Sequence, residues 1–285
     1  MKAVKLYKTL KRDFILPEMR EDWNAAVLPL KKYVLPAYKK NSIGLVLDFA
    51  KTITHVFTAV EPSPKVMKEI LRRNISDALL FVHHPAVWNI NLAPKVFSPM
   101  DLKLVKEFKR RRIAVFNLHH PLDAFGKYST SAALAEALGL KQLKPFAKFD
   151  GVRCGVIGKT TVKTTAGIKD KLKEITGHKV KLYPYGKNSI NLGKVAVVAG
   201  GGNGADFLAE AFSKSVNTFI SGISVKNRNP RAIKAHEFAE KHGINILGGT
   251  HNSTEKFACM KMRGYFEALG LPAEFIDDKP CFEDM

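Results

Sequence analysis

The sequence has few cysteines, no long apolar run and a shortage of acidic residues. Its three cysteines, Cys154, Cys259 and Cys281, are an odd number without C-x-x-C spacing, which argues against a disulfide framework or a cysteine zinc site and favours a reducing compartment. No stretch approaches the roughly 18 apolar residues that a membrane helix needs, and lysines interrupt the first residues too often for a signal peptide. We therefore expect a cytoplasmic protein without a membrane segment.

The acidic residues are outnumbered by basic ones. Forty-six lysines and arginines stand against 26 aspartates and glutamates, which gives a formal net charge of +20. Such a field attracts anionic substrates and allows nonspecific nucleic-acid binding, and the run FKRRR at 108–112 could contact phosphates. The alternative is that lysine-rich helix faces are simply solvated. The charge therefore bears on solubility and nonspecific association, and it does not indicate a reaction.

Common catalytic motifs are also absent. There is no G-x-S-x-G elbow, no P-loop and no cysteine placed like a nucleophile. Gly200, Gly202 and Ala205 fit G-x-G-x-x-A, but the next strand end reads TFISGIS and lacks the acidic residue that a dinucleotide site needs. We interpret the glycines as tight strand-to-helix packing, although the N–H groups at the helix start could hold a substrate phosphate.

What the sequence does contain is an alternation of apolar, strand-length runs with amphipathic, helix-length segments. Strands are expected at 54–60, 78–82, 113–118, 194–200, 217–221 and 244–249. Helices are expected at 63–74, 99–112, 129–140, 165–177, 203–215 and 230–243. Because most of the strands are apolar throughout, they indicate sheets covered on both faces. The chain is long enough for two α/β domains, each with a central sheet flanked by helices.

The change of domain is expected near residue 148. The segment 142–152 loses the helical period and contains Pro145 and Gly151. This predicts a first α/β domain over 1–148 and a second over 149–247.

Histidines follow three of the expected strands directly. The five residues are His83, His84, His119, His120 and His251. In a parallel open sheet, ligands gather at the carboxyl ends of the strands, so separate strand exits can become neighbours in space. This convergence predicts a metal site, whereas any one of these histidines alone is explained equally well by hydrogen bonding.

A carboxylate lies four residues after two of these histidines. If the segment that starts at His251 is a helix, Glu255 lies near the same face at its first turn and can reach the same centre. Asp123 follows His119 at the same spacing, but Pro121 makes 119–123 a turn.

The number of ligands indicates two ions. Adjacent strand residues point to opposite faces, so His83 and His84 could not bind one ion while extended, and Pro85 ends the strand. Four of these imidazoles and the two carboxylates are already too many for one four-coordinate catalytic ion, and they suit a bridged pair of divalent cations. Without thiolates, the set favours Zn²⁺, Fe²⁺, Mn²⁺ or Co²⁺ over Ca²⁺.

The stretches FVHHPAVW, HHPLDAFG and GGTHNSTEKFACMKMRGYFEALG, with NSIGLVL upstream, resemble the Nif-three-like family, also called the GTP cyclohydrolase I type two family. The similarity is ordered and spans roughly residues 41–278, while the first 40 residues match only loosely. The resemblance implies a dinuclear metal site, a toroidal homohexamer, and a two-domain protomer whose C-terminal segment, 248–285, returns to the first domain.

The resemblance also implies roles for individual residues. Five side chains match the family's metal ligands: His83, His84, Asp123, His251 and Glu255. Glu255 would bridge the ions. His119 matches a histidine beside the metals, which is a ligand or, as we favour, a catalytic acid/base group. The chain departs from the family at His120, which is an extra histidine, and at 220–227, where an acidic residue is often found.

We therefore expect a metal-dependent hydrolase. A metal-bound hydroxide would attack a small phosphorylated or nucleotide-like substrate while His119 moves a proton, and the family label implies opening of the purine ring of GTP. One alternative is a nucleic-acid-binding or scaffold protein with structural metals, although no recognised nucleic-acid motif is present. A metal-handling or regulatory protein would fit the same ligands.

Overall fold

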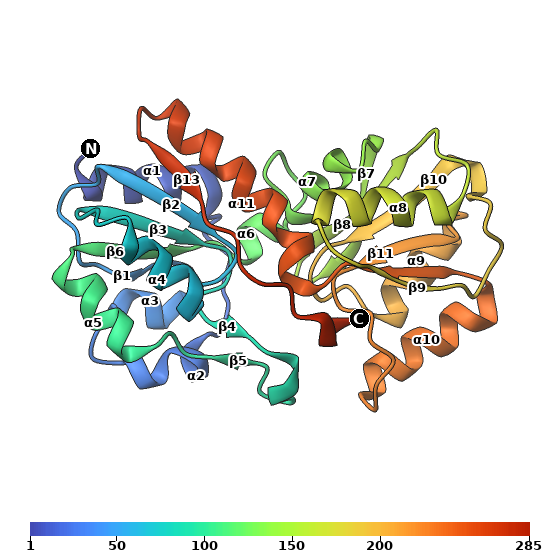
Figure 1. The fold of residues 1–285 in the computed structure, drawn as a ribbon, viewed down its shortest axis with the longest axis horizontal. Helices are drawn as coiled ribbons and strands as arrows, with labels where there is room; N and C mark the ends of the chain where they lie inside the picture. Colours follow the sequence, from blue (N-terminus) through green and yellow to red (C-terminus); the bar gives the residue numbers. More distant parts are fainter. The chain divides into compact units, whose positions relative to one another are not determined.

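The computed structural model describes residues 1–285 and divides the chain into two compact units. The first unit contains 1–122 and 259–279, and the second contains 123–258 and 280–285. Figure 1 shows central strands with helices beside them in each unit. The α/β class predicted from the sequence is confirmed. None of the helices has the length and apolar character that crossing a membrane requires.

The sheet of the first unit has five strands in the order β1-β6-β3-β2-β13. Their bounds are Gly44–Leu47 for β1, His55–Ala59 for β2, Ala78–Val82 for β3, Ile113–Asn117 for β6 and Ala273–Phe275 for β13. The last four are parallel in this sheet, and β1 is antiparallel to β6. Because parallel strands end at the same edge, the segments that follow β2, β3 and β6 leave the sheet together.

Helices of the first unit cover this sheet, and a short hairpin projects from it. The helices are α1 (Ala3–Phe14), α2 (Asn24–Val27), α3 (Pro36–Asn41), α4 (Pro64–Arg72) and α5 (Leu102–Arg110), and the hairpin pairs β4 (Val87–Trp88) with β5 (Phe97–Ser98). The start of α4 follows its sequence signals, because Ser63 caps the backbone of Val66 and Pro64 takes the first helical position. Short 3-10 turns lie at Leu28–Leu30 and Ile90–Leu92.

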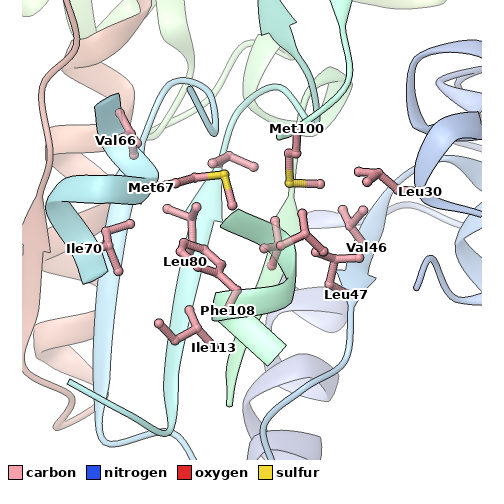
Figure 2. Close-up of a cluster of buried hydrophobic side chains, with 14 of the residues drawn as sticks. Leu30, Val46, Leu47, Val66, Met67, Ile70, Leu80, Met100, Phe108 and Ile113 are labelled. Atoms are coloured by element: carbon pink, nitrogen blue, oxygen red, sulfur yellow. The ribbon is translucent and has the colours of Figure 1, made fainter. Parts of the chain in front are cut away.

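The core of the first unit holds the strand exits in place. Figure 2 shows Met67 and Ile70 of α4 and Phe108 of α5 beside Leu80 of β3, and all four side chains are fully buried. Each contributes about 1.5–3 kcal/mol through burial. The N-terminal segment adds Trp23 and others to the same core, so it is part of the unit.

The sheet of the second unit has six strands in the order β7-β8-β10-β11-β12-β9. Their bounds are Lys141–Phe149 for β7, Val152–Lys159 for β8, Lys181–Tyr183 for β9, Lys194–Val198 for β10, Thr218–Ser221 for β11 and Asn245–Gly248 for β12. Strands β10, β11 and β12 are parallel, and the other three pair antiparallel. The helices are α7 (Thr130–Ala137), α8 (Thr165–Thr176), α9 (Ala205–Ser213) and α10 (Pro230–His242).

Two helices contain the points at which the chain passes from one unit to the other. The one-turn helix α6 (His120–Asp123) and the long helix α11 (His251–Ala268) each contain a boundary between them. The short turns Asn191–Gly193 and Phe282–Asp284 complete the elements. The sequence prediction of a turn at 119–123 becomes a single helical turn, because proline is tolerated in the first turn of a helix.

The hairpin of β7 and β8 is not expected from the sequence. Its first strand has exposed residues at both ends and only Phe146 and Ala147 buried, so it lacks the alternation that predicts a strand. Residues 142–152, where the sequence places a change of domain, form most of this hairpin and belong to the six-stranded sheet. The division of the chain into two independently folding domains near residue 148 stays a prediction.

Candidate metal-binding residues

Strands β3 and β6 of the first unit deliver three histidines to the same edge of its sheet. His83 and His84 follow β3, and His119 lies two residues after β6. The backbone N–H groups of His83 and His84 donate to the carbonyls of Ala59 and Val60 at 3.3 and 2.8 Å, which ties this exit to the end of β2. The side chains of both histidines are buried, and that of His119 is 21% exposed. The expected neighbourhood of these two exits is therefore present.

The three imidazoles are close enough to share an ion. One nitrogen from each of His83, His84 and His119 lies within 4.8 Å of the others. Two nitrogen ligands on a tetrahedral zinc ion lie about 3.3 Å apart, so modest side-chain adjustment would bring these atoms into coordination. The cluster is one that could hold a divalent cation.

The chemistry of the donor set fits a metal. Nδ1 of His83 lies 3.0 Å from the carbonyl oxygen of Leu118, and because a carbonyl can only accept, Nδ1 carries the proton. The lone pair of His83 is therefore on Nε2. Metal-binding histidines commonly have this arrangement, in which the second ring nitrogen donates to a carbonyl or carboxylate.

Aromatic side chains line the imidazoles. The ring of Trp23 packs edge-on against His84 and His119 at centroid distances of 5.8 and 5.2 Å. Phe97, from the β4–β5 hairpin, lies 5.1 Å from His84 and 5.2 Å from Trp88. An apolar wall of this kind limits solvent access and strengthens electrostatic interactions at the nitrogens.

Glu21 is a site residue that the sequence reasoning missed. Its side chain, 5% exposed, accepts hydrogen bonds from Nδ1 of His119 at 3.1 Å, from the backbone N–H of His120 at 2.8 Å and from the indole of Trp23. Burial opposes its charge, but these hydrogen bonds outweigh burial and hold the pKa of Glu21 below its usual range. No spacing in the sequence connects Glu21 to a histidine. The hydrogen bond from its backbone N–H to Glu21 also fixes the position of His120. The ring of His120 stacks on that of His119 at a centroid distance of 5.7 Å.

In the second unit, His251 and Glu255 form a pair at the start of α11. Nε2 of His251 lies 3.3 Å from Oε1 of Glu255, and the two side chains are 5% and 4% exposed. This is the i,i+4 arrangement that the sequence predicts for the first helical turn. The carboxylate of Asp284 accepts from the backbone N–H of His251 at 2.8 Å, so residues close to the C-terminus hold the start of this helix.

The glycine loop after β10 makes room for Glu255. A Cβ added at Gly200 would lie 2.0 Å from Oε1 of Glu255, and Gly200 has a φ of +64°, which favours glycine. The backbone N–H of Gly200 donates to Thr254 at 3.0 Å, and a Cβ at Gly202 would meet Val198. The G-x-G-x-x-A pattern therefore serves close packing, as interpreted from the sequence, and it shapes the surroundings of a proposed ligand.

Asp123 lies in the second unit, at the end of α6. Its Oδ1 accepts a hydrogen bond from the hydroxyl of Thr130 at 3.1 Å. The sequence-predicted residues are thus divided between the units, with His83, His84 and His119 in the first and Asp123, His251 and Glu255 in the second. That all of them serve one dinuclear centre stays a prediction.

His236 has a structural role. It is buried on α10 in the second unit. Its Nδ1 accepts from the hydroxyl of Tyr185 at 2.9 Å, and its Nε2 donates to the carbonyl of Ser224 at 3.0 Å. Burial lowers the pKa of His236, so the neutral ring that these bonds require is favoured.

The cysteines should react slowly in the folded protein. Burial, followed by the charge of Asp123, raises the pKa of Cys154 to about 12, and burial with nearby acids raises the pKa of Cys281 to about 12. The side chain of Cys259 is fully buried. At pH 8 we expect alkylation by iodoacetamide to be at least about 100-fold slower than in urea, because the thiolate is the nucleophile. Mass spectrometry of both samples tests this, and rapid native labelling at Cys154 would contradict it.

Comparison with known proteins gives a consistent result. The family model described as Duf34/NIF3 (NGG1p interacting factor 3) matches residues 27–280. A GTP cyclohydrolase 1 type 2 homolog of Borreliella burgdorferi is 30% identical over 229 residues, covering 80% of this chain and 84% of that protein. The homolog of the same name in Deinococcus radiodurans is 26% identical over 246 residues, covering 85% and 87%.

Solved structures show the same fold. The protein ybgI, described as of unknown function, has a TM-score of 0.74 at 20% identity and covers 99% of this chain and 100% of its own. TTHA1606 from Thermus thermophilus has a TM-score of 0.67 at 22% identity, covering 99% and 100%. Reduced HcgD from Methanocaldococcus jannaschii has a TM-score of 0.65 at 20% identity, covering 97% of each chain.

Proposed function

Because this chain belongs to the Duf34/NIF3 family, we propose that it is a metal-dependent hydrolase of small phosphorylated or nucleotide-like substrates. The observation that carries the proposal is the approach of buried His83 and His84, as proposed ligands, to His119, as the proposed acid/base group, at the edge of the first sheet. The buried imidazole of His83, whose Nδ1 already donates to a fixed carbonyl, is suited to a divalent cation.

The proposal includes two divalent cations per subunit, drawn from Zn²⁺, Fe²⁺, Mn²⁺ and Co²⁺. The proposed ligands are His83, His84, Asp123, His251 and Glu255. Such ions, when bound, supply a water acidic enough to act as hydroxide near neutral pH. We propose Glu255 as the shared carboxylate.

The chain's own residues have separate tasks in this scheme. His119 donates through Nδ1 to Glu21, so its Nε2 has a lone pair that can take a proton during hydrolysis. Trp23 and Phe97 exclude bulk water from the imidazoles. The backbone hydrogen bonds of His83 and His84 to the end of β2 fix the position of the main chain from which the two imidazoles extend.

The proposed substrate class is supported by the charge and by the relatives' names. The net charge of +20 attracts phosphorylated molecules over those without phosphate. The relatives described above are named GTP cyclohydrolase 1 type 2 homologs, so GTP is the first substrate to test. We further propose the toroidal homohexamer implied by the family, which light scattering would test.

Removal of metal is expected to abolish turnover. Protein dialysed against a chelator should lose GTP hydrolysis, followed both as purine absorbance and as phosphate release, and should regain it with one of the four proposed ions. Elemental analysis before dialysis identifies the resident metal. Protein that is purified without any divalent metal and takes up none would contradict the proposal, as would turnover unaffected by the chelator.

Nucleic-acid binding is the alternative, and the structure gives it little support. In the basic run at 108–112, Arg110 pairs with Glu107 and Arg112 pairs with Asp77, both at 2.7 Å, so part of its charge is already neutralised. Binding through several phosphates would weaken steeply as salt increases.

A further inference from the structure

We infer that Glu21 is a positioning residue that holds His119 in the tautomer with its proton on Nδ1 and its lone pair on Nε2. The inference rests on the proposed function for its chemical purpose, which is proton transfer by His119. Its structural content, the tautomer of one histidine, can be measured without metal or substrate. Glu21 precedes residues 27–280, the part of the chain that the family model matches.

The carboxylate of Glu21 is fixed by donors on both oxygens. Oε1 accepts from the backbone N–H of His120 at 2.8 Å, and Oε2 accepts from Nδ1 of His119 at 3.1 Å and from the indole N–H of Trp23. The side chain is 5% exposed, so water cannot replace these donors easily. The carboxylate has one well-defined orientation, and it faces the imidazole.

The backbone around Glu21 is held as firmly as its side chain. Its N–H donates to the carbonyl of Asn41 at 3.0 Å, and the N–H of Trp23 donates to the hydroxyl of Ser42 at 3.0 Å. Trp23 itself belongs to the core of the first unit. Glu21 therefore approaches His119 from a rigid segment, which is what a positioning residue requires.

Only one neutral tautomer of His119 satisfies this arrangement. A carboxylate accepts hydrogen bonds and cannot donate, so the ring nitrogen that faces it must carry the proton. The alternative tautomer would place the lone pair of Nδ1 against a negative oxygen in a buried site. Glu21 therefore leaves Nε2, the other ring nitrogen, with the lone pair and fixes the plane of the ring.

The first experiment measures the tautomer directly. Metal-free protein with ¹⁵N-labelled histidine is examined by magic-angle-spinning NMR, which is not limited by particle size, and the His119 signals are assigned by their loss in His119→Gln. We expect a protonated Nδ1 and an unprotonated Nε2 in the wild-type protein. A proton on Nε2 of neutral His119 would overturn the inference, whether or not the protein is an enzyme.

The second experiment replaces Glu21 with glutamine, which keeps its shape. A glutamine has one acceptor oxygen and an NH₂ group, so it cannot serve the donors on both sides of the native carboxylate. We expect the proton of His119 to move to Nε2 in part or completely. Glu210→Gln is the matched control, because Glu210 also bonds a backbone N–H, that of Ala147, and an arginine, Arg153, outside the site. An unchanged His119 spectrum in a folded Glu21→Gln protein would overturn the inference.

Steady-state kinetics distinguish a positioning role of Glu21 from a general structural effect. Glu21→Gln should lower kcat for GTP by about 10–100-fold with little change in KM, and it should lower kcat no further in a His119→Gln background. Equal losses in both backgrounds would show that Glu21 does not act through His119. If the wild-type protein has no metal-dependent turnover, the proposed function fails, while the NMR result still decides the tautomer.

Discussion

Alanine in place of Glu255 is expected to remove bound metal and turnover together. Glu255 is 4% exposed, pairs with His251 at 3.3 Å and fills space that Gly200 leaves open. As the proposed shared carboxylate, it would compensate the charge of both ions, and its loss would affect both. We expect metal affinity to fall by at least about 100-fold, which exceeds the usual effect of changing a residue behind a ligand.

Elemental analysis and GTP turnover on the same samples test this expectation. Glu237→Ala is the control, because Glu237 is an exposed glutamate on α10. Thermal unfolding of the metal-free proteins shows whether the variant folds. Unchanged metal content in folded Glu255→Ala would contradict the proposed ligand set. If turnover is then lost although the metal is retained, Glu255 acts in turnover without being a metal ligand.

Gly200→Ala is expected to destabilise the second unit and to disturb Glu255. The added Cβ would lie 2.0 Å from Oε1 of Glu255, so that side chain would have to move, and alanine would have to adopt a φ of +64°. The left-handed conformation alone costs about 1–2 kcal/mol, and the clash adds to it, so the free energy of unfolding should fall by about 2–4 kcal/mol. Metal binding should weaken as well.

Gly151→Ala separates strain from clash. Gly151 has a φ of +86°, and nothing lies within 4 Å of an added Cβ, so only the conformational cost remains. Urea unfolding should therefore show a smaller loss for Gly151→Ala, and its metal content should stay unchanged. Equal losses of stability together with unchanged metal content in both variants would show that Glu255 does not depend on the space at Gly200.

The sequence predicts well those parts of the fold that carry their own pattern. Strand β3 is apolar and buried throughout, and its bounds agree with the predicted 78–82. The helix at α4 is marked by Ser63 and Pro64. Strand β7 carries no such pattern, since its two buried residues, Phe146 and Ala147, are adjacent instead of alternating.

The candidate site likewise has parts that the sequence predicts and parts that it does not. The approach of His251 and Glu255 could be predicted because one helical turn brings them together. Glu21 and His119 are 98 residues apart, and only the folded N-terminal segment joins them. The partner of Gly200 could not be predicted either, because a glycine pattern indicates close packing without identifying the side chain that approaches.

The edge strand β7 explains part of the excess positive charge. An open edge exposes unpaired backbone groups, which can recruit strands of other molecules and lead to aggregation. In β7, exposed lysines occupy positions 141, 144 and 148, and Pro145 lacks the N–H group that an incoming strand would need. Lysine and proline at such an edge oppose strand addition. These three lysines thus protect the chain against aggregation. Their presence is explained without an anionic partner.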